Sequence, residues 1–255
     1  PIINLGIGSP DLQPPKKVVE ALSQGLLSPK AHKYQSYQGL PELRQAITSF
    51  YRMNYGVVLN ANTEVLPLMG SKEGIMHISM AYLDKGNDVL IPNPGYPTYQ
   101  SVTKLLEANP VFYELDATNN WLPDLKSLEQ KDLSNVKLMW VNYPHMPTGA
   151  KASKAFFEEL IAFAKRNQIL IINDNPYSFI LNDEPLSILA IEGAKEVALE
   201  LNSLSKSFNM AGWRTGMVMG KAEHIQHVLK VKSNMDSGMF YGIQKGAVKA
   251  LESTT

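Results

Sequence analysis

The sequence contains no cysteine, and this absence excludes a disulfide framework. Lysine plus arginine equals aspartate plus glutamate at 24 each, so no overall field draws the chain to nucleic acid or to an anionic membrane. No segment approaches the roughly 18 to 20 apolar residues of a membrane span, and the beginning of the chain lacks the basic start and apolar run of a secretory signal. We therefore expect a cytoplasmic protein whose partners are small molecules, with no nucleic acid and no membrane among them.

Repeats, low-complexity tracts and long flexible linkers are also absent, which indicates one continuous large domain. From about Glu64 onwards, apolar strand-like runs alternate with amphipathic helix-like runs, the pattern of an α/β domain. The part before residue 60 is less regular apart from one helix. The strands are expected at 65–69, 88–91, 136–141, 169–173, 198–201 and 216–220, and the helices at 41–55, 72–83, 98–107, 153–166 and 222–232.

The most informative stretch is SLSKSFNMAGWRTG, which runs from Ser203 to Gly216. A lysine reacts with an aldehyde only while its amine is unprotonated, so such lysines lie in desolvated pockets near other positive charge. Lys206 has apolar neighbours along the chain. The guanidinium of Arg214 is always charged and can bind a phosphate through two hydrogen bonds. A lysine among apolar residues is more often a surface side chain with a buried stem, and only the surrounding motif favours a reactive one.

This stretch closely resembles the active-site segment of fold-type I, pyridoxal-phosphate-dependent aminotransferases of the class I/II family. The resemblance implies that Lys206 is the Schiff-base lysine and that Ser203 and Arg214 hold the phosphate of pyridoxal 5′-phosphate. The SxxK pattern from Ser203 to Lys206 is also typical of penicillin-binding proteins and β-lactamases, but these need SDN and KTG, and neither tripeptide occurs.

The resemblance covers nearly the whole chain and implies a three-layer α/β/α large domain with a mostly parallel mixed sheet. Residues 1–30 are expected to be an N-terminal segment that contributes to the substrate site, and residues 31–255 the large domain that binds the cofactor. The segments SKSFNMAGWRTG and SNMDSG look closest to the branch that contains aspartate-like, methionine-like and LL-diaminopimelate aminotransferases.

Ligands of α/β sheets gather outside the carboxyl ends of the strands, so the residues after each strand are candidates. Ser71 and Lys72 follow the first expected strand at a helix N-terminus, which suits a phosphate, although a serine there can simply cap its helix. The resembled family binds the phosphate at this turn. Tyr96 follows the second strand in a rigid proline-rich turn, where the resemblance implies a ring that stacks on the cofactor.

Asp174 and Tyr177 follow the strand expected at 169–173. A buried carboxylate beside a pyridine nitrogen keeps that nitrogen protonated, which makes the ring an electron sink. An aspartate after a strand is more often a turn residue. The resemblance assigns the pyridine role to Asp174 and a hydrogen bond with the phenolate oxygen of the cofactor to Tyr177, so the expected catalytic residues are Lys206, Asp174 and Tyr177.

One position departs from the family pattern. The motif NYPHMPTG has Met146 where the family normally has an asparagine that binds the phenolate oxygen. A thioether cannot donate a hydrogen bond and is a weak acceptor. We therefore expect a raised pKa of the Schiff base relative to family members with asparagine, unless Asn142 or His145 compensates.

Two further segments bear on substrate and assembly. The segment Asn4–Asp11 fails the GxGxxG nucleotide pattern and resembles the family's N-terminal segment, where Gly8 lets the substrate carboxylate approach the backbone. The segment KYQSYQGLPELR resembles one whose first tyrosine, Tyr34, reaches the phosphate of the neighbouring subunit, with Tyr37 a weaker candidate. A homodimer with shared active sites is therefore expected, and Asn234 is a further candidate near the dimer contact.

Arginine is scarce, and family members carry one in a C-terminal small domain that clamps the substrate carboxylate. The four arginines here are Arg44, Arg52 and Arg166 on apparently ordinary helices and Arg214, already assigned to phosphate. We therefore expect the clamp beyond Thr255 and the small domain to be largely absent from this sequence.

The leading hypothesis is an aminotransferase that moves an amino group between an L-amino acid and a 2-oxo acid. A C–S β-lyase is a rival because the same cofactor site supports elimination and the fold does not fix the reaction. A third reading is the non-catalytic effector-binding domain of a transcription regulator, although no basic DNA-binding module is visible. The sequence does not identify the amino acid or the oxo acid.

Overall fold

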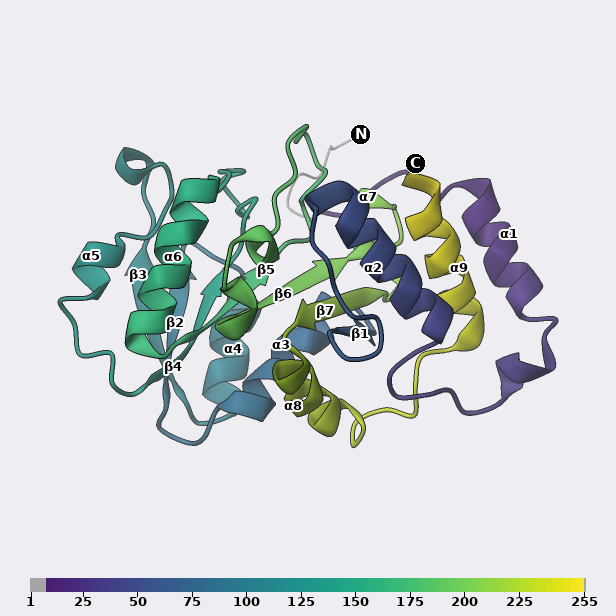
Figure 1. Cartoon of the computed structure of the whole chain (residues 1–255), viewed down its shortest axis with the longest axis horizontal. Coiled ribbons are helices and arrows are strands. Elements are labelled where there is room, and N and C mark those ends of the chain that lie inside the picture. The colour runs from purple at the N-terminus through teal and green to yellow at the C-terminus, as the bar shows by residue number, and fades with distance from the viewer. Residues whose placement is uncertain (1–7, 255) are drawn as a thin grey trace, which may run out of the picture.

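The centre of the computed structural model, which describes residues 8–254, is a seven-stranded sheet with the order β1-β7-β6-β5-β4-β2-β3 (Figure 1). Strand β7 pairs antiparallel with β1 and β6, and all other neighbours are parallel. The predicted mostly parallel mixed sheet is confirmed. Its strands are β1 (Val65–Leu68), β2 (Asp88–Asn93), β3 (Asn109–Glu114), β4 (Val136–Val141), β5 (Leu170–Asp174), β6 (Ala198–Ser203) and β7 (Gly216–Gly220).

Helices cover both faces of the sheet, as the three-layer prediction requires (Figure 1). One buried cluster joins the sheet to α3, α4 and α8, and the other joins it to α2, α6 and α9. Neighbouring strand residues such as Leu138 and Met139 belong to different clusters because side chains alternate across a strand. The helices are α1 (Lys16–Gly25), α2 (Pro41–Tyr55), α3 (Ser71–Tyr82), α4 (Pro97–Leu105), α5 (Leu125–Leu128), α6 (Lys154–Asn167), α7 (Leu204–Ser207), α8 (Ala222–Lys232) and α9 (Tyr241–Leu251).

Local signals explain the helices that the sequence predicts. Helix α2 begins with Pro41 and ends at Gly56, which adopts the left-handed conformation that closes a helix. Helix α6 is capped by the Ser153 hydroxyl, which accepts a hydrogen bond from the Phe156 N–H at 3.1 Å. The beginning of the chain is more regular than expected, because α1 buries one side against α9 (Figure 1).

Strand register brings several chain segments to one edge of the sheet. Gly216, the first residue of β7, pairs with both Leu68 at the end of β1 and Ser203 at the end of β6. Asp174 at the end of the parallel neighbour β5 pairs with Leu201. This edge therefore collects the carboxyl ends of β1, β5 and β6 together with the beginning of β7.

None of the helices in the part of the chain that the structure describes combines the length and the apolar character needed to span a bilayer.

Candidate active site

One pocket of about 210 Å³ at this edge gathers most of the predicted site residues. A larger hollow of about 470 Å³ beside Tyr143 and Ser153 is lined by none of them. The structure therefore brings together predicted residues that lie far apart in the chain. The predicted residues that line the pocket are Ser71, Lys72, Tyr96, Asp174, Tyr177, Ser203, Lys206 and Arg214.

Lys206 lies in the short helix α7, directly after β6. The apolar neighbours Leu204 and Met210 are buried, so the helix is anchored in the core. The Lys206 Nζ donates a hydrogen bond to the Gly8 carbonyl and lies 5.9 Å from the centre of the Tyr177 ring. The structure therefore places two further predicted residues beside the lysine amine, while the rest of the predicted segment before Gly8 lies outside the described residues.

Asp174 ends β5 and is 5% exposed. Its Oδ2 accepts a hydrogen bond from the Tyr99 hydroxyl at 2.9 Å, whereas its buried Oδ1 has no hydrogen-bond partner within residues 8–254. Burial raises the pKa of Asp174 to about 6, and the hydrogen bond from Tyr99 opposes that shift. A buried acceptor without a partner is costly, so Oδ1 is suited to a donor that arrives in the pocket.

Tyr99 on α4 also lines this pocket, and the sequence analysis did not single it out. It is fully buried, its ring stacks on Trp140 with centroids 4.9 Å apart and planes at 9°, and its hydroxyl holds Asp174. The signal that could have found it is its spacing of three residues from Tyr96 in the same turn-and-helix segment. Tyr96 itself contacts the Tyr99 ring edge-on at 5.6 Å.

Replacing Tyr99 with phenylalanine is expected to raise the pKa of Asp174 further, because the hydrogen bond that lowers this pKa is lost while the ring stacking remains. The midpoint can be followed by NMR of carbon-13-labelled aspartate carboxyl groups. Tyr113→Phe is the matched control, since it removes a buried hydroxyl that binds the Trp140 carbonyl and not Asp174. Equal midpoints in both variants would contradict the expectation.

The pocket-lining residues Ser71, Ser203 and Arg214, together with the adjacent glycines Gly70 and Gly216, form a group that we call the phosphate corner. Gly70 has φ +92°, and a Cβ there would collide with the Arg214 guanidinium. A Cβ on Gly216 would lie 2.6 Å from the Ser71 nitrogen. Both glycines thus let backbone and guanidinium approach closely.

Donors in the phosphate corner suit an anion. The N-terminus of α3 offers N–H groups that the helix itself does not use. Arg214 is held in the left-handed region at φ +53°, and its Nη1 donates to the Ala211 carbonyl at 2.6 Å. Such backbone strain concentrates at functional sites. The Ser203 hydroxyl is buried within 2.9 Å of the Ser205 hydroxyl, so a second hydroxyl belongs to the set.

Met146 lines the pocket as the predicted departure from the family pattern. Neither expected substitute is free to take over. The side-chain oxygen of Asn142 accepts from the Met146 N–H at 2.8 Å, and its amide nitrogen donates to the Asp174 carbonyl. The ring nitrogens of His145 face Thr148 and the Pro94 carbonyl, at 2.8 and 3.2 Å.

The substitution Met146→Asn is therefore expected to lower the pH midpoint of the visible spectrum of the chain with its cofactor, because a donor to the phenolate oxygen is restored. A spectral pH titration measures this midpoint. Met235→Asn makes the same change at an exposed position outside the pocket and should leave the midpoint unchanged. Identical midpoints for the wild type and the Met146 variant would remove this explanation.

The residues predicted to act at a subunit contact do not line this pocket. Tyr34 is 91% exposed, and Tyr37 is exposed as well. The loop that carries them is anchored by a hydrogen bond within the same chain, which the Arg44 Nη1 donates to the Gly39 carbonyl at 2.8 Å. The Asn234 amide donates to the Lys230 carbonyl at 2.8 Å. Their roles at a partner subunit stay predictions.

Comparison with known proteins identifies the family. A family model described as aminotransferase class I and II matches residues 1–255. The chain belongs to this family. Enzymes of the class use pyridoxal phosphate, and the pocket fits that cofactor because it offers an amine at Lys206, an unpaired acceptor at Asp174 and an anion-binding corner at Arg214.

Named relatives and solved structures of aminotransferases resemble the chain along almost all of its length. It is 44% identical over 255 residues to an LL-diaminopimelate aminotransferase of Dehalococcoides mccartyi and 42% identical over 252 residues to one of Aquifex aeolicus. These alignments cover 99% and 98% of the chain but 66% and 65% of the relatives, so the chain spans less than two thirds of their length.

Among solved structures, substrate-bound BacF from Bacillus subtilis matches with a TM-score of 0.96 and 42% identity, covering 99% of this chain and 64% of that one. An aminotransferase from Staphylococcus aureus matches with a TM-score of 0.95 and 34% identity, covering 99% and 67%. The arrangement of the described aminotransferase segment is therefore that of its solved relatives.

Proposed function

We propose that the protein containing this chain is a pyridoxal 5′-phosphate-dependent aminotransferase that moves an amino group between an L-amino acid and a 2-oxo acid. The observation that carries the proposal is the convergence of the Lys206 amine, the buried Asp174 carboxylate and the phosphate corner on one pocket.

When bound, the cofactor supplies an aldehyde that links to a lysine amine and a ring that withdraws electrons from the substrate α-carbon. Lys206 would bind that aldehyde and would serve as the base and acid that moves a proton at the substrate α-carbon. Asp174, whose buried Oδ1 lacks a partner among the described residues, would keep the ring nitrogen protonated. Tyr177 would donate to the ring oxygen, and Tyr96 would offer a flat face to the ring.

The remaining predicted residues orient the cofactor and the substrate. Ser71, Ser203 and Arg214 hold the phosphate, with Lys72 contributing its backbone N–H or its ammonium. Gly8 lies beside Lys206, where a substrate carboxylate can approach the backbone. Because several relatives at 41 to 44% identity are named LL-diaminopimelate aminotransferase, LL-diaminopimelate is the first amino donor to test.

Assembly, location and domain division belong to the same proposal. Tyr34 is exposed and lies on a loop that Arg44 anchors. This supports a homodimer in which the Tyr34 ring reaches the cofactor phosphate bound by the partner subunit. The absence of cysteine fits the reducing cytoplasm. We retain residues 1–30 as the segment that contributes to the substrate site and 31–255 as the cofactor-binding domain.

The test is the visible spectrum of the purified chain with pyridoxal 5′-phosphate, recorded before and after adding single L-amino acids without any oxo acid. Loss of the visible band with stoichiometric release of a 2-oxo acid is the expected result and names the donor. Release of pyruvate and ammonia from a cysteine-like substrate would indicate a C–S lyase instead. A band that no amino acid alters would contradict a catalytic role for this chain.

A further inference from the structure

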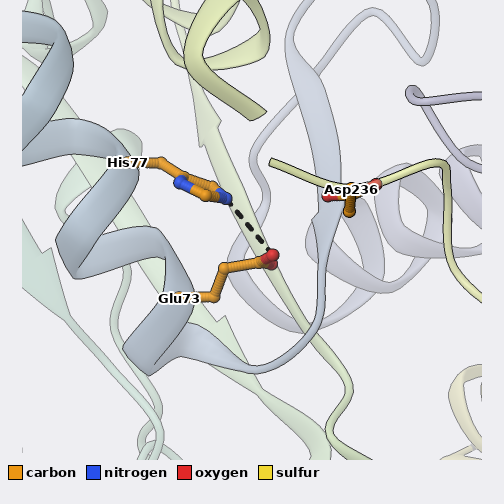
Figure 2. Close-up of side chains that lie close together, drawn as sticks. All are labelled: Glu73, His77 and Asp236. Atoms are coloured by element: carbon orange, nitrogen blue, oxygen red, sulfur yellow. Dashed lines mark ion pairs between the residues drawn. The ribbon is translucent and has the colours of Figure 1, made fainter. Parts of the chain in front are cut away.

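Four side chains that carry or can carry charge meet behind the phosphate corner. Glu73 and His77 project from successive turns of α3 towards Asp236 in the α8–α9 connection (Figure 2). Their ligand atoms all lie within 4.8 Å of one another. The fourth member, Lys232 at the end of α8, is 1% exposed. We call these four residues the α3–α8 cluster.

Lys232 supplies a cation to the cluster. Its Nζ donates to both Asp236 oxygens, at 2.9 and 2.7 Å, and the Gly238 N–H donates to Asp236 Oδ1 at 2.7 Å. A histidine with two carboxylates is a donor set that metals use. Here the Lys232 ammonium already neutralises the Asp236 carboxylate, which leaves only Glu73 and His77 as free ligands, and we assign the α3–α8 cluster no metal.

The cluster is connected to the phosphate corner through Glu73. The Glu73 Oε2 accepts a hydrogen bond from the Met69 N–H at 2.6 Å, and its Oε1 lies 3.2 Å from the His77 Nε2. Gly70 is the N-cap of α3 and has no side chain to cap the helix. A glutamate at the third helical position that reaches back to the preceding backbone fixes the entry of the chain into the helix.

The His77 ring faces the other oxygen of that glutamate, and Asp236 lies within 4.8 Å of both without a hydrogen bond to Glu73 among the described residues. The His77 ring is 2% exposed, and its nitrogens have no hydrogen-bond partner among the described residues beyond the Glu73 contact. Asp236 is tied to α8 by Lys232 and to its own loop by Gly238. The two Glu73 oxygens have different partners, the Met69 N–H and the His77 ring, so the carboxylate has little freedom to turn.

We propose that the α3–α8 cluster is a positioning device that holds the turn Met69–Ser71 against Arg214, and so sets the affinity of the pocket for a phosphate. The proposal rests on the proposed function, because it assumes that the phosphate of the cofactor occupies this corner. None of the four residues lines the pocket. Their effect on phosphate binding passes through the Glu73 contact with Met69 and the backbone of Gly70.

The test compares the dissociation constant for pyridoxal 5′-phosphate with that for pyridoxal, which lacks the phosphate. Thermal unfolding of the cofactor-free chain is measured alongside, to compare the stability of each variant with that of the wild type. One variant is Glu73→Gln. The other combines Lys232→Met with Asp236→Asn, which removes both charges together and keeps an acceptor for Gly238, so that no buried charge is left unpaired. For Glu73→Gln, which replaces the charged acceptor of the Met69 N–H with a neutral one, affinity for pyridoxal 5′-phosphate should fall about tenfold. The double variant should lower it by a smaller factor, and affinity for pyridoxal should stay unchanged in both.

The matched control is Lys154→Met with Glu158→Gln, which removes an exposed lysine–carboxylate pair of the same helical spacing on α6. It should change neither constant. If the wild type does not prefer pyridoxal 5′-phosphate over pyridoxal, the phosphate corner and the proposed function both fail. If the wild type has that preference and both cluster variants keep it, or if both ligands weaken equally, the positioning role alone is overturned.

Discussion

Replacing Lys206 with alanine is expected to abolish covalent attachment of pyridoxal 5′-phosphate to the chain. Lys206 is the lysine whose amine meets Gly8 and Tyr177 at the pocket, and only an amine can be fixed to the aldehyde by borohydride reduction. Mass spectrometry of the reduced protein should show the added cofactor mass in the wild type and no added mass in the variant. The rate of amine transfer should fall by on the order of 10²–10⁴-fold with the loss of the base.

Lys72 provides the comparison within the same pocket. Its Nζ lies 5.9 Å from the centre of the Tyr96 ring, so it offers a second ammonium close by. Lys72→Ala should keep the covalent attachment at Lys206, since we assign it a role at the phosphate only. Attachment that persists in Lys206→Ala and disappears in Lys72→Ala would reverse the assignment of the two lysines.

The substitution Asp174→Asn is expected to impair function and to stabilise the cofactor-free chain. An amide cannot hold a proton on the ring nitrogen as a carboxylate does, so the rate of amine transfer should fall by about 10²–10³-fold. The rate of loss of the visible band after addition of an amino acid measures this step. A rate within a few-fold of the wild type would exclude the proposed role of Asp174.

The stability effect follows from burial. The pKa of Asp174 rises from its ordinary 3.8 to about 6 in the folded chain. Folding therefore favours the neutral acid, and the wild type loses stability as the pH rises from 3.8 through about 6. At about 1.4 kcal/mol per pKa unit, the asparagine variant should be more stable above that range by up to about 3 kcal/mol.

Urea unfolding of the cofactor-free proteins at several pH values measures this difference, which should shrink as the pH falls towards 3.8. Asp183→Asn, at an exposed position, should show no such pH-dependent gain. If Asp174→Asn is no more stable than the wild type at neutral pH, the buried Asp174 carboxylate does not destabilise the folded chain. The expected pattern, lower activity with higher stability, is typical of a residue kept for function.

The sequence predicted candidate residues that follow strands, and the structure places them around one pocket. Ser71, Asp174 and Lys206 all lie where a strand ends and a helix or turn begins, and Arg214 lies just before β7. Parallel strands bring their carboxyl ends to one edge, so strand order alone gathers such residues. The resemblance then supplied their individual roles, which neither spacing nor composition could provide.

The residues and elements that the sequence did not reveal depend on packing. The contact of Tyr99 with Asp174 joins positions 75 residues apart. Strand β3 is an edge strand that includes Pro110 and lacks a regular burial pattern. Helix α9 contains Gly242 and Gly246, which weaken its helical signal.

Those glycines are explained only by tertiary contacts. A Cβ on Gly246 would lie 2.5 Å from the Trp213 ring, and one on Gly25 of α1 would lie 3.3 Å from the Gly242 Cα. The two helices approach closely because both carry glycine at the contact. Intrinsic helix propensity therefore underestimated α9, since close packing against α1 and Trp213 compensates for its glycines.

Gly216 restricts the register in which β7 can pair with its neighbouring strands. It pairs with Leu68 on one side and Ser203 on the other, and has no room for a side chain beside Ser71. If β7 slipped by one residue during folding, Thr215 or Met217 would bring a side chain into that crowded position, and the slip would also turn inward-facing residues outward. The register that leaves room at Gly216 therefore also fixes the backbone from which Arg214, two residues before Gly216, and Lys206, three residues after Ser203, enter the pocket.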